Sequence, residues 1–151
     1  MKRFVFRLER VRELRERAER EQAAVLGSAL GEERRGQAAL DDAQRALETA
    51  RGQAADAASG TAVAAGSLRN LELARDAAER GVERADEHLR EAGERVREEQ
   101  VKYGERRRDL RVLERLKEQR LESWREDASR DEQKTIDGVA LRRHQQGEKT
   151  S

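Results

Sequence analysis

Apolar side chains in the second half of the chain recur at alternating steps of three and four residues. The stripe contains Leu68, Leu71, Ala78, Val82, Ala85, Leu89, Ala92, Val96, Tyr103, Leu110 and Leu113, and it is interrupted only at Arg75, Glu99 and Arg106. This is the spacing of the a and d positions of a coiled coil, and it predicts a long helix over about residues 68–146. After Lys117 the stripe continues in a shifted register through Leu121, Trp124 and Ala128, as a stutter in the heptads would produce.

The first half carries a weaker stripe of the same kind. Its members are Leu26, Ala29, Glu33, Gly36, Leu40, Ala43, Leu47, Ala50, Ala54 and Ala57, preceded one register away by Phe4, Leu8, Val11, Ala18 and Val25. This stripe predicts a first helix over about residues 2–58. The segment that follows is uncharged and contains two glycines. Gly60 is suited to end the first helix and Ser67 to cap the second, so we expect a turn over about residues 59–67.

A turn at that place folds the chain into an antiparallel hairpin, in which residue i faces a residue near 125 − i. In this register small side chains face large ones, for example Gly36 opposite Leu89, as closely spaced helices require. A parallel dimer would pair Gly36 with itself and leave the glycine unexplained. We therefore predict an all-α fold, a long antiparallel two-helix coiled coil forming one domain over residues 1–147. A frayed tail is expected over residues 147–151.

One layer of the predicted seam is polar. Gln22 and Glu19 fall opposite Glu99, Tyr103 and Arg106 in the hairpin register. Such a layer is typical of a position that sets the register of a coiled coil. It also fits a place where a partner supplies the missing packing, so both interpretations stay open.

The composition favours helices that bury a narrow stripe over a globular core. Charged residues make up 43% of the chain, aromatic residues make up 3%, and proline is absent. A disordered chain of this charge would lack the regular apolar spacing. The net charge of +1 argues against a general affinity for nucleic acid. Residues 1–20 carry eight basic and four acidic side chains, and residues 101–126 carry nine and six, so the open end of the hairpin should be basic.

The sequence offers little material for catalysis or metal binding. Cysteine is absent, and the two histidines, His88 and His144, lie far apart on the same predicted helix. We expect no catalytic, cofactor-binding or metal-binding residue, no enzyme activity and no cofactor. No apolar run has the roughly 20 residues that a membrane span needs, so we expect a cytoplasmic protein without direct membrane insertion. The basic amphipathic segment over residues 2–20 leaves surface binding to lipid as a weak alternative, because glutamates interrupt it.

Both ends of the chain carry a recognisable residue pattern. The first end has Phe4-Val5-Phe6-Arg7-Leu8-Glu9-Arg10-Val11 and then Arg12-Glu13-Leu14-Arg15-Glu16. The second has Leu113-Glu114-Arg115-Leu116-Lys117-Glu118, Leu121, Trp124, Asp131-Glu132-Gln133-Lys134, Asp137, Ala140, Arg142 and Arg143. In order and spacing, over nearly the whole chain, this pattern resembles the flagellar export protein FliJ family of bacterial type III secretion systems. Gly138 departs from the pattern, because the family often has an acidic residue there.

The resemblance implies an antiparallel coiled coil similar to the rotor shaft of rotary ATPases. It also implies a non-catalytic part of the flagellar export apparatus, which binds the hexameric export ATPase, contacts the cytoplasmic part of the export gate and helps to recycle export chaperones. Such a protein would be a monomer when free and would associate peripherally with the inner face of the cell membrane through the apparatus. An injectisome stalk protein and a generic coiled-coil structural adaptor are the alternatives. The ATPase-binding positions would be Phe4, Leu8, Val11, Leu14, Leu121, Trp124, Gln133, Lys134, Asp137 and Arg143.

Overall fold

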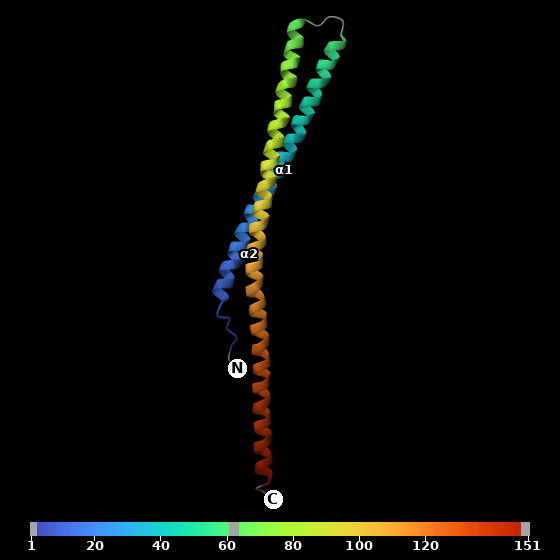
Figure 1. Cartoon of the computed structure of the whole chain (residues 1–151). Coiled ribbons are helices and arrows are strands. Elements are labelled where there is room, and N and C mark those ends of the chain that lie inside the picture. The colour runs from blue at the N-terminus through green and yellow to red at the C-terminus, as the bar shows by residue number, and fades with distance from the viewer. Residues whose placement is uncertain (1–2, 61–63, 149–151) are drawn as a thin grey trace. The chain divides into compact units, whose positions relative to one another are not determined.

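The computed structural model describes residues 3–60 and 64–148, with the side chains up to residue 143. The described chain consists of two long helices, α1 (Glu9–Ser59) and α2 (Ala65–Glu148), and has no strand (Figure 1). The predicted all-α hairpin of two long helices is confirmed. The contacts within the chain group its residues into two compact units, and the expected single domain stays a prediction. We call residues 20–105 the hairpin unit, and residues 1–19 with 106–151 the terminal unit.

The hairpin unit has a core only one side chain wide. Ala29 and Leu40 of α1 and Val96 of α2 are among its few buried residues. The helices approach closely at Gly36, where a Cβ atom would lie 3.4 Å from the Cα atom of Leu89. A Cβ atom at Gly36 would just be in van der Waals contact with Leu89, so this spacing leaves no room for a large side chain. The predicted pairing of Gly36 with Leu89 is confirmed.

Ion pairs along the edges of the hairpin unit follow the same register. Arg95 Nη1 lies 2.8 Å from Glu32 Oε2, and Arg51 Nη2 lies 3.2 Å from Glu79 Oε1. All four side chains are largely exposed, and pairs of this kind contribute about 0.2–1 kcal/mol each. They therefore reinforce a register that the apolar stripe already sets.

The polar layer of the hairpin unit is built around Glu99, which is only 9% exposed. Lys102 Nζ donates a hydrogen bond to Glu99 Oε1 at 2.8 Å, and the amide of Gln22 donates another to the same carboxylate. These two hydrogen bonds, first that of Lys102 and then that of Gln22, hold the pKa of Glu99 below its ordinary value. A shift of the register would separate Glu99 from Gln22 and leave a nearly buried charge with less compensation. The Gln22–Glu99 contact thus favours the register-setting interpretation.

The terminal unit departs from the sequence pattern at its start, because α1 begins at Glu9 and not near residue 2. Residues 3–6 belong to no helix or strand and residues 7–8 form a turn, which Glu9 N–H closes by donating to the Phe6 carbonyl at 3.1 Å. Phe4 and Phe6 are half-buried and Val5 is exposed, the alternation of an extended segment. Aromatic and β-branched side chains are poor helix formers, so packing decides the conformation of this segment. We call residues 3–8 the N-terminal arm.

The ends of α2 also differ from the expected bounds. The helix begins at Ala65, so Ser67 lies inside the first turn, where its N–H donates to the Ala64 carbonyl at 2.8 Å. Ala65 favours the helical conformation, so α2 begins before Ser67 and the serine does not cap it. Positions 61–63 of the expected turn lie outside the described residues. Gly147 and Glu148 of the expected frayed tail belong to α2, and residues 149–151 lie outside the described part.

Gly36 provides a direct test of the helix packing. We expect Gly36→Leu to lower the free energy of unfolding by about 1–3 kcal/mol, because its side chain must displace α2 at Leu89. Gly52→Leu is the matched control, because a Cβ atom there has no neighbour within 4 Å. Leucine is also a better helix former than glycine, by about 0.5–1 kcal/mol, so the control should be slightly stabilised. Denaturant unfolding followed by circular dichroism measures both, and equal changes in the two variants would contradict the close approach.

Candidate functional site

An aromatic contact fixes the N-terminal arm to α2 in the terminal unit. The ring centroids of Phe4 and Trp124 lie 6.1 Å apart, and the ring planes are tilted by 58°. This geometry lies in the favourable range for aromatic pairs. Leu121 precedes Trp124 by almost one helical turn and is half-buried like it. The structure thus brings together Phe4 and Trp124, two of the predicted site residues from opposite ends of the sequence.

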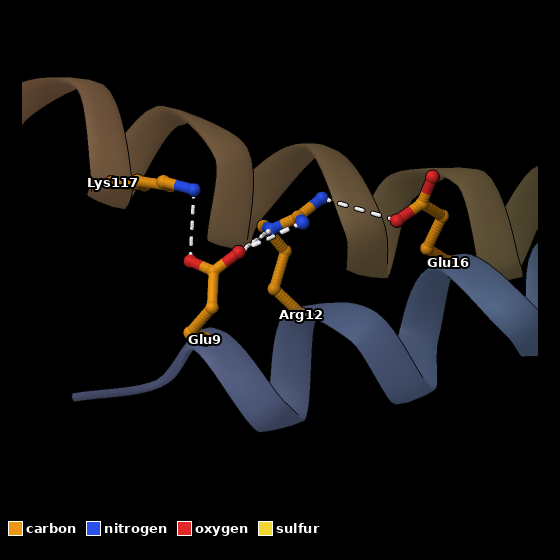
Figure 2. A network of polar contacts seen from close by, with 4 residues as sticks. All are labelled: Glu9, Arg12, Glu16 and Lys117. Carbon is orange, nitrogen blue, oxygen red and sulfur yellow. Dashed lines mark hydrogen bonds and ion pairs between the residues drawn. The ribbon is translucent and has the colours of Figure 1, made fainter. Parts of the chain in front are cut away.

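A chain of charges fixes the first turns of α1 to α2 next to the arm (Figure 2). Lys117 Nζ lies 2.8 Å from Glu9 Oε2, and Arg12 Nη2 lies 2.8 Å from Glu9 Oε1. Arg12 Nη1 continues to Glu16 Oε2 at 3.2 Å. Hydrogen bonds from Lys117 and then Arg12 lower the pKa of the Glu9 carboxyl, and its location in the first turn of α1 suits a negative charge. Sequence reasoning missed this network, although Glu9 and Lys117 match the predicted register.

Three predicted site residues on α1 and the arm are exposed and form no part of the packed stripe. Leu8 is 38% exposed, Val11 is 41% exposed and Leu14 is 64% exposed. Leu14 lies in a shallow depression that Arg10, Glu13 and Arg17 also line. These two arginines form no ion pair within the described part of the chain, whereas Arg12 is paired with Glu9 and Glu16. The outer side of α1 therefore combines exposed apolar side chains with charges that form no ion pair in the described structure, two arginines and one glutamate.

The remaining predicted residues lie farther along α2 and make local contacts. Gln133 Nε2 donates to Asp137 Oδ1 at 3.0 Å, Lys134 Nζ lies 3.7 Å from Asp131 Oδ1, and Arg143 is exposed. At about 100° per residue, Gln133 and Asp137 project from the side of α2 opposite to Trp124, and Lys134 projects from its flank. The predicted site thus falls into two parts, one around the Phe4–Trp124 contact and one on the polar side of the α2 tail.

No group of three or more His, Cys, Asp or Glu side chains within the described part of the chain is arranged to hold a metal ion. No helix in the same part is both long and apolar enough to cross a membrane. The features of the terminal unit are the Phe4–Trp124 contact beside the ion pairs of Glu9, the exposed apolar side chains on the arm and α1, and the polar side of α2 beyond Trp124.

Comparison with known protein families matches residues 4–149 to the family described as Flagellar FliJ protein. The chain belongs to this family. The match covers α1, all of α2 and all but the first residue of the arm, and it confirms the family that the residues at both ends resemble. Membership makes the chain a component of the flagellar export apparatus, in a family of non-catalytic coiled-coil proteins. Comparisons with curated proteins and with solved structures find no match.

The Glu9 network makes the stability of this FliJ-family chain depend on pH. Because the folded state lowers the pKa of Glu9, its ionised carboxylate stabilises the fold above the ordinary pKa near 4.5. That contribution is lost as the pH falls through the lower pKa of the folded state. We therefore expect Glu9→Gln to have a lower Tm than the wild type near neutral pH, and the difference to shrink in acid.

Thermal unfolding at a series of pH values measures that difference. Glu13→Gln is the control, because Glu13 lies on the exposed side of α1 and has no ion pair in the described structure. Its Tm should stay close to that of the wild type at every pH. A Tm difference for Glu9→Gln that is constant from neutral to acidic pH would show that charge at Glu9 is not the cause.

Proposed function

We propose that the chain binds the hexameric ATPase of the flagellar export apparatus through its terminal unit and serves there as a stalk. The observation that supports this most strongly is the Phe4–Trp124 contact, with exposed Leu8, Val11 and Leu14 on the arm and α1. Aromatic anchors and arginines carry a large share of the binding free energy at protein interfaces. Both kinds of side chain are present in this unit, within a family that belongs to the export apparatus.

The contacts that hold the arm favour tight binding. Phe4 is packed on Trp124, and Glu9 is bound to Lys117 and Arg12. A surface whose side chains are already fixed loses less conformational entropy when a partner covers it. The arm and the start of α1 therefore offer a preformed contact area, in contrast to a segment that must fold on binding.

Charge on the outer side of α1 should speed the encounter with a partner. Arg10 and Arg17 flank exposed Leu14, and residues 1–20 carry a net charge of +4, eight basic minus four acidic side chains. A charged surface of this kind raises the association rate at low salt, and the effect weakens as salt screens the charges. Binding to the ATPase should therefore weaken with increasing ionic strength.

The same proposal includes the other partners of the apparatus. The chain would contact the cytoplasmic part of the export gate and help to recycle export chaperones. It would be held at the inner face of the cell membrane through these proteins. A monomeric free chain fits the hairpin unit, because Ala29, Leu40 and Val96 are already buried within one chain and are not available to a second copy.

Stimulation of the export ATPase tests the central part of this proposal. Purified chain should raise the rate of ATP hydrolysis by the export ATPase of the same bacterium. Leu8→Asp combined with Trp124→Ala should weaken the apparent affinity at least about tenfold, because it removes two anchors of the contact area. Val112→Asp is the control, because Val112 is an exposed apolar residue of α2 outside the proposed contact.

Circular dichroism of each variant establishes that the helices are intact. Full stimulation by the Leu8→Asp, Trp124→Ala variant would contradict the proposed contact area. A wild-type chain that binds the ATPase without changing its activity would contradict the proposed role as a stalk.

A further inference from the structure

A groove runs along α2 in the terminal unit, beginning at Trp124, which Phe4 of the arm contacts. Its volume is about 740 Å³. Asp131, Glu132 and Ile136 are among the residues that line it, and we call its two small lining residues, Ala128 and Thr135, the floor. Counted from Trp124, the lining residues recur at helical steps of three and four, which places them on one side of α2.

The groove has the geometry that receives a second helix in a coiled coil. In such packing, one side chain of the second helix enters a hole formed by residues i, i+3, i+4 and i+7 of the first. Ala128, Asp131, Glu132 and Thr135 are such a set, and all of them line the groove. Because the residues at the floor are small, a leucine-sized side chain has room to enter. Trp124 shares this side of α2, so the groove continues the interface that the arm already makes.

Apolar side chains at the far part of the groove are open to solvent. Ile136 is 62% exposed, and Val139, less than one turn later, is 41% exposed. The neighbouring stretch of the same helix side, at Leu121 and Trp124, is half-buried. Within the described chain, the arm thus covers the beginning of this helix side and leaves its continuation uncovered.

The rim of the groove is acidic and defines the chemistry of its occupant. Asp127 and Asp131 form long local ion pairs with Arg130 and Lys134, at 3.6 and 3.7 Å, and Glu132 forms none in the described structure. These side chains are at least 68% exposed, and ion pairs of this kind contribute little to stability. Three carboxylates, those of Asp127, Asp131 and Glu132, and no basic side chain are among the residues that line the groove. A helix that lies in this groove would therefore be favoured by basic residues along its edges.

We propose that this groove is a docking site for a basic amphipathic helix of a partner protein, which would extend the coiled coil along residues 124–139. Trp124 belongs to both surfaces, and the groove beyond it is separate from the rest of the proposed ATPase contact on α2, because Gln133 and Asp137 project from the opposite side of the helix. An anionic membrane does not fit, since the acidic rim would repel its head groups. One helix face buries less than about 1,200 Å², so the contact should be transient and in the micromolar range.

The fluorescence of the full chain reports directly on this site, because Trp124 is its single tryptophan. The probe is a synthetic tryptophan-free peptide of about three heptads, with leucine at positions a and d and arginine at e and g. Its twin has glutamate at e and g, and like charges at these positions keep both peptides from pairing with themselves. We expect the arginine peptide to shift the Trp124 emission with saturation at micromolar concentration, and the glutamate peptide to leave the emission unchanged.

Charge reversal on the rim should reverse this preference. Asp131→Lys with Glu132→Lys should weaken binding of the arginine peptide at least about tenfold and permit binding of the glutamate peptide. Glu122→Lys with Glu126→Lys is the matched control, because it changes the net charge equally on the far side of α2. The control should bind the arginine peptide nearly as the wild type does.

A third variant separates docking in the groove from simple attraction between charges. Ala128→Phe keeps the charge but fills the floor, and it should abolish the saturable emission shift. Equal binding of both peptides to the wild type, or unchanged binding of the arginine peptide to Ala128→Phe, would overturn the proposal. Sedimentation of the chain alone would also overturn it if it revealed a dimer that Ala128→Phe dissociates, because the groove would then receive a second copy.

Discussion

The register of α1 against α2 is the constraint on which the other features depend. In the hairpin unit two contacts fix the register. Gly36 of α1 packs closely against Leu89 of α2, and Gln22 forms a hydrogen bond with Glu99. In the terminal unit the contact of Glu9 with Lys117 satisfies the same relation between residue numbers. Because a two-helix core is one side chain wide, a shift of the register would remove many small contacts together.

Packing of α1 on α2 in one fixed register explains how a chain with so many charges can be ordered. Most of its ion pairs are exposed, and each contributes little, so stability comes from the repeated burial of small apolar side chains along the seam. The nearly buried charge of Glu99 adds specificity, because Gln22 of α1 donates one of the hydrogen bonds that stabilise it. The polar surface that remains is free to present binding residues in the terminal unit, as Leu14 between Arg10 and Arg17 illustrates.

The sequence predicted the parts of the structure that depend on periodicity. The two helices, the pairing of Gly36 with Leu89 and the polar layer at Glu99 follow from spacings that persist over many turns. The arm was predicted to be helical, because Phe4 and Leu8 fit the heptad pattern. Its packing on Trp124 outweighs that local signal.

The candidate site was predictable only in part. The hairpin register placed Phe4 near Trp124, whereas Gln133, Lys134 and Asp137 came from the family resemblance alone. The network around Glu9 was not predicted, because residue spacing does not say which of many neighbouring carboxylates a lysine or arginine will bind. The groove beyond Trp124 depends on which part of α2 the arm leaves uncovered, and only the structure supplies that.

Disulfide trapping tests the intramolecular register most directly, because the described chain contains no cysteine that could interfere. A Cβ atom at Gly36 would lie 3.8 Å from Cβ of Leu89, a separation that a disulfide spans without strain. Gly36→Cys with Leu89→Cys should therefore form a bond within single molecules on mild oxidation of a dilute solution. Gly36→Cys with Val96→Cys, one heptad out of register, should not. Crosslinks that form only between molecules, or equally in both variants, would contradict an antiparallel hairpin in this register.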